Sequence, residues 1–189
     1  MFILYAVLIG LVLGFLVGGR PAGLGDLQLR WSWIIVGGLL VQVVLFSEPV
    51  SGRVGALGPP IYVASTAAVI AAVVANRAIT GMLVVAAGAA SNLLAIVANG
   101  GYMPVSAGAA AILGAHQPSA YSNSAQLPDP MLAPLTDIFA LPPWVPFANV
   151  FSVGDVLIGI GIGIVIVAAM RTRSARPTIS VVRTFPFAD

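Results

Sequence analysis

The 189-residue sequence contains no cysteine, no lysine and a single histidine. Without cysteine there is no disulfide framework and no thiolate nucleophile, and one histidine cannot build a histidine metal site. Charged residues are also scarce, at 7%, and the eight arginines are scattered singly or grouped near the C-terminus. This distribution lacks the basic face of a nucleic-acid-binding protein. We therefore expect no nucleic-acid partner, no metal and no cofactor.

Hydrophobic residues, in contrast, are abundant. They make up 59% of the chain, and the mean hydropathy is +1.05. A soluble domain of this length carries far more charge and far less apolar surface. The composition therefore predicts an integral membrane protein.

Five apolar segments are candidates for membrane-spanning helices. They cover residues 2–17, 31–46, 61–75, 81–98 and 153–170. With their flanking residues, they approach the roughly 20 residues that a helix needs to cross the hydrocarbon core. The runs lack the alternation of a membrane barrel, so helices are expected. The first segment has neither a basic n-region nor an A-x-A cleavage pattern, which favours a retained helix over a signal peptide. The predicted fold class is an all-α membrane protein, a five-transmembrane-helix bundle that forms a single domain over residues 1–170.

The arginines indicate the orientation of this bundle. With the N-terminus outside, only Arg53 lies in an outer segment. The inner segments then hold Arg20, Arg30, Arg77, Arg171, Arg173, Arg176 and Arg183. This excess of arginine on one side predicts an N-out/C-in, multi-pass protein of the bacterial cytoplasmic (inner) membrane, with residues 171–189 as an Arg-rich cytoplasmic tail.

The segment 99–152, between the fourth and fifth spans, is predicted to be a long extracytoplasmic loop cap. Its length exceeds that of an ordinary connection. "SAGAAAILGA", from Ser106, predicts a short helix with a serine N-cap. "FALPPWVPF", residues 139–147, combines aromatics and prolines in a way typical of a segment that lies at the membrane interface.

Glycines on two spans predict close helix packing. Gly10, Gly14 and Gly18 recur every four residues in the first span, and Gly159 and Gly163 lie in the last. Small residues let helix backbones approach closely in lipid, where apolarity alone does not drive association. Packing inside the bundle and binding of a partner helix, or of a second copy in a homo-oligomer, are both consistent with this pattern.

Two stretches flanking the long loop hold candidate site residues. Asn92 and Asn99 are seven residues apart, so both amides are expected on one helix face, where they join helices or bind a polar ligand group. Asn99 could also end the helix together with Gly100. In "SVGD", Ser152 and Asp155 match a helix capping box. The carboxylate at this helix start could also bind a lipid headgroup or partner, or take part in catalysis.

The same two stretches resemble motifs of the bacterial lipoprotein signal peptidases. "SNLLA" and "FSVGDVLIGIG" are similar to the Gly-Asn-Leu-Ile-Asp-Arg and Phe-Asn-x-Ala-Asp stretches of that family, which imply an aspartyl dyad near the outer membrane surface. Asn92 and Asp155 match, whereas Ala95 stands in place of the first aspartate. Ile96 replaces the arginine of the first motif and Ser152 the asparagine of the second.

The missing aspartate bears on activity. Aspartyl proteolysis needs two carboxylates, one as base and one as acid, so Asp155 alone cannot perform it. Asp137 could supply the second carboxylate if the loop folds down over the helix ends.

A second resemblance covers nearly the whole chain. The series "LVGGR", "LRWSW", "NGGYMPVS", "LTDIFALP" and "NVFSVGDVLIGIG" is similar to an uncharacterised family of small bacterial membrane proteins, known as domain of unknown function 5317. The resemblance implies five helices and no known activity. It also implies that Asp137, Ser152 and Asp155 are candidate site residues.

Two functions follow as expectations. The first is a non-catalytic accessory or scaffolding subunit that binds membrane lipid or partner transmembrane helices through its outer face. The alternative is a diverged aspartyl intramembrane peptidase acting on lipoproteins or membrane-embedded peptides. In the alternative, Asp155 and Asp137 form the dyad, and Asn92 and Asn99 position the substrate.

Overall fold

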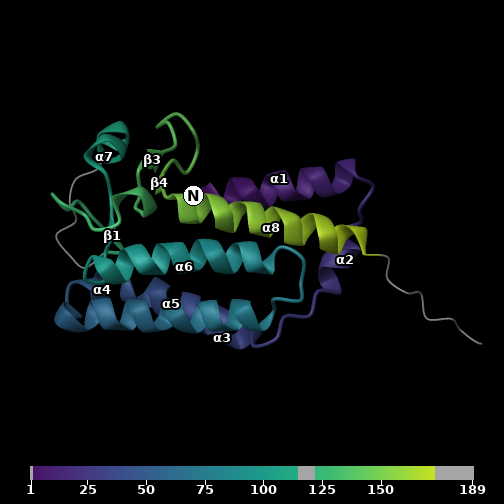
Figure 1. Cartoon of the computed structure of the whole chain (residues 1–189), viewed down its shortest axis with the longest axis horizontal. Helices are drawn as coiled ribbons and strands as arrows, with labels where there is room; N and C mark the ends of the chain where they lie inside the picture. The colour runs from purple at the N-terminus through teal and green to yellow at the C-terminus, as the bar shows by residue number, and fades with distance from the viewer. Residues whose placement is uncertain (1, 115–121, 173–189) are drawn as a thin grey trace, which may run out of the picture.

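The computed structural model describes residues 2–114 and 122–172, and most of these residues are helical (Figure 1). The long helices are α1 (Phe2–Leu16), α3 (Ser32–Leu45), α5 (Gly58–Ala75), α6 (Met82–Ala98) and α8 (Val153–Arg171). The short ones are α2 (Ala22–Gly25), α4 (Glu48–Ser51), η1 (Gly55–Leu57), α7 (Ala107–Leu113) and η2 (Ala133–Leu135). His116 and nearly all of the predicted cytoplasmic tail lie outside the described residues.

Each long helix coincides with one apolar segment of the sequence to within three residues at either end. Two helical stretches, Gly55–Ala75 and Val153–Arg171, are long and apolar enough to cross a membrane. Helices α1, α3 and α6 are apolar but shorter. Prolines in the first turn of α5, where their missing amide hydrogens cost nothing, explain why that helix begins three residues before the predicted segment.

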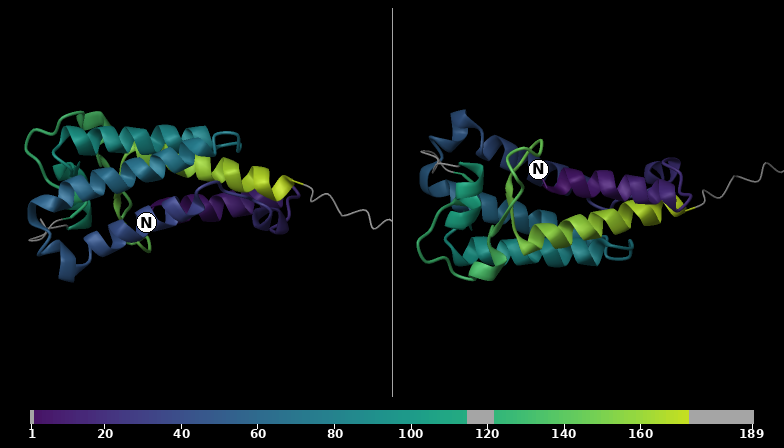
Figure 2. Two further views of the ribbon diagram at one scale, coloured as in Figure 1. Left: turned by 90° about the horizontal axis from the view of Figure 1, so that it is seen from below. Right: turned by 90° about the horizontal axis from the view of Figure 1, so that it is seen from above.

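The long helices run side by side along the long axis of the molecule (Figures 1 and 2). Helix α8 lies between α1 and α6, α6 also contacts α5, and α5 contacts α3. Helices α1 and α8 are neighbours in space although they are far apart in the sequence, so α8 completes the bundle by packing against the first helix. Helix α7 and the β-strands gather at one end, which we call the loop end (Figure 1).

Close contact between α1 and α8 depends on glycine. A Cβ at Gly10 would lie 3.0 Å from the Cα of Gly163, and one at Gly159 would lie 3.0 Å from the Cβ of Ala6. A side chain at Gly14 would overlap Met170. These glycines therefore pack helices within the chain. Gly18 differs from the prediction, because α1 has already ended and the residue adopts φ +78° in a turn with no neighbour within 4 Å of a Cβ.

The loop segment is fixed by short strands that the sequence analysis does not expect. Strand β1 (Met103–Pro104) pairs in parallel with β2 (Ser124–Ala125), and β3 (Phe139–Ala140) pairs antiparallel with β4 (Val150–Phe151). Two-residue strands are too short to leave an alternating pattern. The predicted helix from Ser106 is present as α7, and the Ser106 hydroxyl accepts a hydrogen bond from the amide of Ala109.

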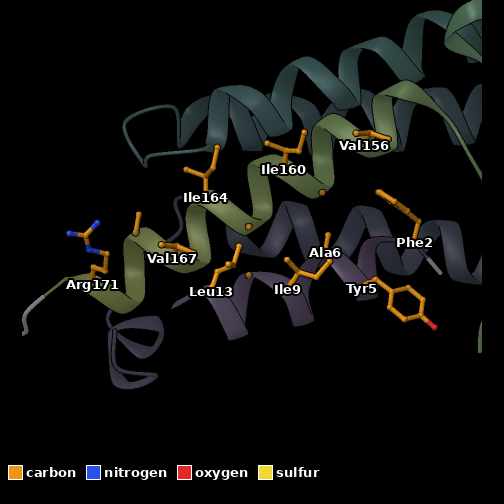
Figure 3. Close-up of a pocket in the computed structure, with 14 residues that line it drawn as sticks. Phe2, Tyr5, Ala6, Ile9, Leu13, Val156, Ile160, Ile164, Val167 and Arg171 are labelled. Atoms are coloured by element: carbon orange, nitrogen blue, oxygen red, sulfur yellow. The ribbon is translucent and has the colours of Figure 1, made fainter. Parts of the chain in front are cut away.

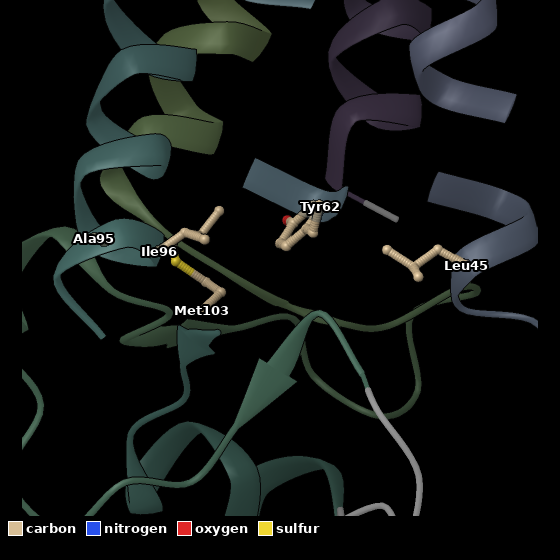
Figure 4. Close-up of a cluster of buried hydrophobic side chains, with 5 residues drawn as sticks. All are labelled: Leu45, Tyr62, Ala95, Ile96 and Met103. Carbon is tan, nitrogen blue, oxygen red and sulfur yellow. The ribbon is translucent and has the colours of Figure 1, made fainter. Parts of the chain in front are cut away.

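A buried apolar cluster joins this segment to the helices (Figure 4). Met103 of β1 belongs to one buried cluster with Leu45, Tyr62, Ala95 and Ile96, which lie near the ends of three long helices. Burial of these side chains holds β1 against the bundle, since each contributes roughly 1 to 3 kcal/mol when removed from water. The chain between α6 and α8 is thus a docked cap in its described part.

Candidate functional site

Asp155 lies at the start of α8, where the predicted capping box is formed. The amide of Asp155 donates to the Ser152 hydroxyl at 3.0 Å, and the amide of Ser152 donates to Oδ2 of Asp155 at 3.0 Å. Ser152 is fully buried. The capping box fixes the rotamer of the carboxylate, so Oδ1 of Asp155 points in a defined direction.

Asn92 of α6 holds that second oxygen. Its side-chain amide donates to Oδ1 of Asp155 at 2.9 Å, and its carbonyl oxygen accepts from the Ser152 hydroxyl at 2.8 Å. Gly154 allows this contact, because a Cβ there would overlap the Asn92 carboxamide. Asn92, Ser152 and Asp155 thus form one polar triangle across the α6–α8 contact, although Asn92 and Asp155 are 63 positions apart in the sequence. Both carboxylate oxygens of Asp155 have donors, as an acceptor-only group requires.

Asp137 approaches from the loop segment. Its backbone pairs with the edge of β1, because the Asp137 amide donates to the Pro104 carbonyl at 2.9 Å and its carbonyl accepts from the Ser106 amide at 3.1 Å. The residue is only 6% exposed. Burial, and second the negative charge of Asp155, raise the pKa of the Asp137 carboxyl from 3.8 to about 7. Asp137 therefore gains and loses its proton near neutral pH, and it lies close enough to Asp155 for the charge of that carboxylate to matter.

Both acids line one cavity of about 460 Å³ at the loop end. Asn92 of the polar triangle lines it too, as do residues of all five long helices. Its other lining residues are Phe2, Ile3, Gln42, Tyr62, Thr66, Ala89, Ile96, Met103, Asn123, Ser124, Asn149, Val150 and Ile158. The cavity is therefore lined by a mixture of polar and apolar side chains from both the helices and the loop segment.

The sequence analysis missed the polar groups that α3 and α5 contribute. The Gln42 side-chain amide lies 3.2 Å from the Thr66 hydroxyl, to which it donates, and Tyr62 lies one turn nearer the loop end. Gln42 could have been noticed in the sequence as a polar residue inside an apolar span, because in lipid such a side chain needs a hydrogen-bond partner or a function.

Asn99 is not part of this cavity. Helix α6 ends at Ala98, and Asn99 is its C-cap with φ −109°, so its side chain leaves the helical face it was predicted to share with Asn92. Its amide donates to the carbonyl oxygens of Ala95 at 2.7 Å and Met131 at 2.9 Å, and its carbonyl oxygen accepts from the Met131 amide at 2.8 Å. Asn99 therefore ties the loop to α6 and does not face the acids.

Within residues 2–114 and 122–172, no group of three or more histidine, cysteine or acidic residues could hold a metal ion. What the cavity does offer is a pair of carboxyl groups in different environments. One is fixed by neutral donors, and the other is buried and titrates near neutral pH. Two carboxyl groups held in different environments are an arrangement used for general acid–base chemistry.

The molecule is thus a helical protein with apolar helices long enough to cross a membrane and a two-acid cavity at one end. Residues 26–167 match the model of a family described as "Family of unknown function (DUF5317)", and the chain belongs to that family. The match includes Asn92, Asp137, Ser152 and Asp155. Neither the curated proteins nor the solved structures include a match to this chain.

Proposed function

We propose that the protein is an aspartyl peptidase that hydrolyses a peptide bond of a membrane-embedded substrate at the loop end. One observation carries this proposal: Asp137 and Asp155, separated by 18 positions in the sequence, line the same cavity. The geometry supports the peptidase better than the scaffolding role that the sequence analysis puts first, because the missing second carboxylate has a candidate. Asn92 and Ser152 orient Asp155 and act as positioning residues.

The chemistry divides between the two acids. The Asp155 carboxylate takes a proton from a water molecule, whose oxygen attacks the carbonyl carbon of the peptide bond. Asp137 donates its proton to the carbonyl oxygen, so a neutral tetrahedral diol forms. When the diol collapses, one hydroxyl proton returns to Asp137, and the proton on Asp155 passes to the nitrogen as the C–N bond breaks. One water is consumed, and a carboxyl group and an amine are released.

The pKa of Asp137 predicts how activity depends on pH. The protonated acid is lost as pH rises through about 7, so kcat is expected to fall on the alkaline side of that value. Stability should follow the same group. In the unfolded chain Asp137 loses its proton near pH 3.8, so its contribution to stability is complete below that value and is lost as pH rises to about 7.

Thermal unfolding in detergent micelles at pH 4 to 8 would measure the stability effect. D137N carries no titratable group at this position, so its midpoint should depend less on pH than that of the wild type. Equal pH dependence of the two proteins would contradict the burial of an ionisable Asp137.

A membrane topology of five spans, with the N-terminus outside and the C-terminus inside, accompanies this proposal. Large apolar side chains are exposed on the outer faces of the helices, including Leu16 at 76% and Val43 at 68%. Arginine gathers at the end opposite the loop end: Arg20 donates its amide to Met170 at 2.7 Å, and Arg30 contacts Asn76, which neighbours Arg77. Positive residues favour the cytoplasmic side, so the loop end is assigned to the outside.

The cysteine-free sequence makes this topology testable. We expect Glu48→Cys, in α4 at the loop end, to react with a membrane-impermeant maleimide in whole cells. Thr80→Cys, in the exposed turn between α5 and α6 at the other end, should react only after the membrane is opened. Reversed labelling would contradict the orientation. Equal labelling of both positions would contradict the prediction that α5, which lies between them, crosses the membrane.

A non-catalytic subunit that binds lipid or a partner protein is the second candidate. Trp144 is 82% exposed and Phe147 67% exposed in the turn between β3 and β4, at the loop end. Exposed aromatics of this kind favour a membrane interface or a protein surface. Loss of cellular function in W144A but not in D155N would favour this candidate over the peptidase.

A further inference from the structure

An apolar groove of about 560 Å³ runs between α1 and α8 (Figure 3). It lies on a different side of α1 from the acidic cavity, because Ile3 faces that cavity while Ala6, Ile9 and Leu13 line the groove. From α8 it receives Val156, Gly159, Ile160, Gly163, Ile164, Val167, Ala168 and Arg171. Its lining combines small residues with branched apolar side chains. A bound helix could therefore approach closely, as small residues permit in lipid.

The loop end of the groove lies next to the candidate site, with Phe2 between them. Phe2 lines both the groove and the acidic cavity. Its ring stacks on Phe151 of β4, with centroids 4.5 Å apart. On α8, Val156 lines the groove and its neighbour Asp155 lines the cavity. A chain lying in the groove would reach the acids by passing Phe2.

The length of the groove distinguishes between possible occupants. From Val156 to Arg171 it follows 15 helical steps, or roughly 22 Å at 1.5 Å per residue. One leaflet of the hydrocarbon core is only about 15 Å thick. The groove therefore extends beyond the depth that the acyl chains of one phospholipid fill, and it matches most of the length of a transmembrane helix.

Charge at its two ends indicates the direction of that helix. Arg171 lines the end far from the loops, and the Asp155 carboxylate lies beyond the other end. A helix carries a partial positive charge at its N-terminus and a partial negative charge at its C-terminus. A helix whose N-terminus is at the loop end would complement both charges.

We propose that the α1–α8 groove binds the membrane-spanning helix of the peptide substrate, with the N-terminus of that helix at the loop end and its C-terminus at Arg171. That the bound helix belongs to a substrate rests on the proposed peptidase function. The scissile bond then precedes the helix, where the chain passes Phe2 into the acidic cavity. The substrate class is a membrane protein whose helix has an outward N-terminus.

Disulfide cross-linking can test this docking without any cleavage. Val156→Cys and Val167→Cys place single thiols at the two ends of the groove, and Val43→Cys places one on the exposed face of α3. The probe is a synthetic helix of about 22 alanine and leucine residues, with glycine at every fourth position and one cysteine near either end. In D155N protein in nanodiscs, we expect the N-terminal probe to cross-link to V156C and the C-terminal probe to V167C. Each yield should exceed that of V43C at least tenfold.

Gly163 provides a blocking variant. A Cβ there meets nothing within 4 Å and the residue lines the groove, so the side chain introduced by Gly163→Leu starts from open space and narrows the groove. Gly37→Leu on α3 is the matched control, since its Cβ would also be free of neighbours. We expect G163L to reduce cross-linking at V156C at least tenfold and G37L to leave it unchanged.

Three outcomes would overturn the docking proposal: yields no higher than at V43C, yields insensitive to G163L, or a probe paired in the reverse direction. A phospholipid retained on purification by wild type and lost in both G163L and Arg171→Gln would make lipid the occupant and would also overturn it. Cross-linking as expected, together with an absence of cleavage by wild type, would contradict the peptidase function alone.

Discussion

Replacing Asp155 with asparagine is expected to lower peptide cleavage about 10³-fold. The variant retains the shape of the side chain but cannot accept a proton from water, and general base catalysis contributes about 10² to 10⁴ in rate. Asp137→Asn should have a similar effect, because the acid that protonates the carbonyl oxygen is lost. The measurement compares new N-termini among the membrane proteins of cells expressing wild type, D155N or D137N.

The matched control is Asp129→Asn, which changes the same functional group in an exposed loop residue outside the cavity. It should leave cleavage unchanged. Asparagine can still accept the Ser152 amide, so D155N should lose at most about 1 kcal/mol of stability through the helix cap. Cleavage that persists in D155N protein at the wild-type rate would exclude the dyad.

Gly154→Ala is expected to cause the largest loss of stability among single methyl additions in α8. The added Cβ would overlap the Asn92 carboxamide and would lie 2.7 Å from the Gly88 carbonyl oxygen, so α6 and α8 must separate. Overpacking of this kind typically costs about 1 to 3 kcal/mol. Because the clash also displaces Asn92 from Asp155, activity should fall even at temperatures where the variant remains folded.

Gly163→Ala is the matched control, because it also replaces a glycine of α8 by alanine. It adds the same methyl group to the same helix at a position with no neighbour within 4 Å, and alanine is the better helix former by about 1 kcal/mol. We therefore expect G163A to unfold in detergent at or above the wild-type temperature and G154A well below it. Equal stability of the two variants would contradict the close α6–α8 contact.

The sequence predicted the long helices well, because each is an apolar run ended by glycine, proline or polar residues. The capping box at Ser152 and Asp155 was also readable, since its pattern is local. The partnership of Asn92 with Asp155 was suggested only by resemblance to known motifs. Its physical basis is the close approach of α6 and α8 at Gly88 and Gly154, which no local pattern reveals.

The position of Asp137 could not be predicted from the residues around it. It depends on backbone pairing with Pro104 and Ser106, more than 30 positions earlier, and on Met103 docking into the apolar cluster. For Asn99 the sequence left two roles open. The structure has the C-cap role, because α6 ends at Ala98, and the side chain hydrogen-bonds to the loop at Met131 instead of lying beside Asn92.

The neighbours of α8 have a consequence for biosynthesis. Helix α8 leaves the ribosome after the other long helices, yet both α1 and α6 pack against it. In the proposed topology, α1 therefore stays in the bilayer without its partner while more than 130 residues are translated. At about 5 to 20 residues per second this interval lasts several seconds or more. In that topology the glycine face of α1 is open to other membrane helices during this time, so a stalled or shortened chain would expose a helix face that α8 covers in the finished protein.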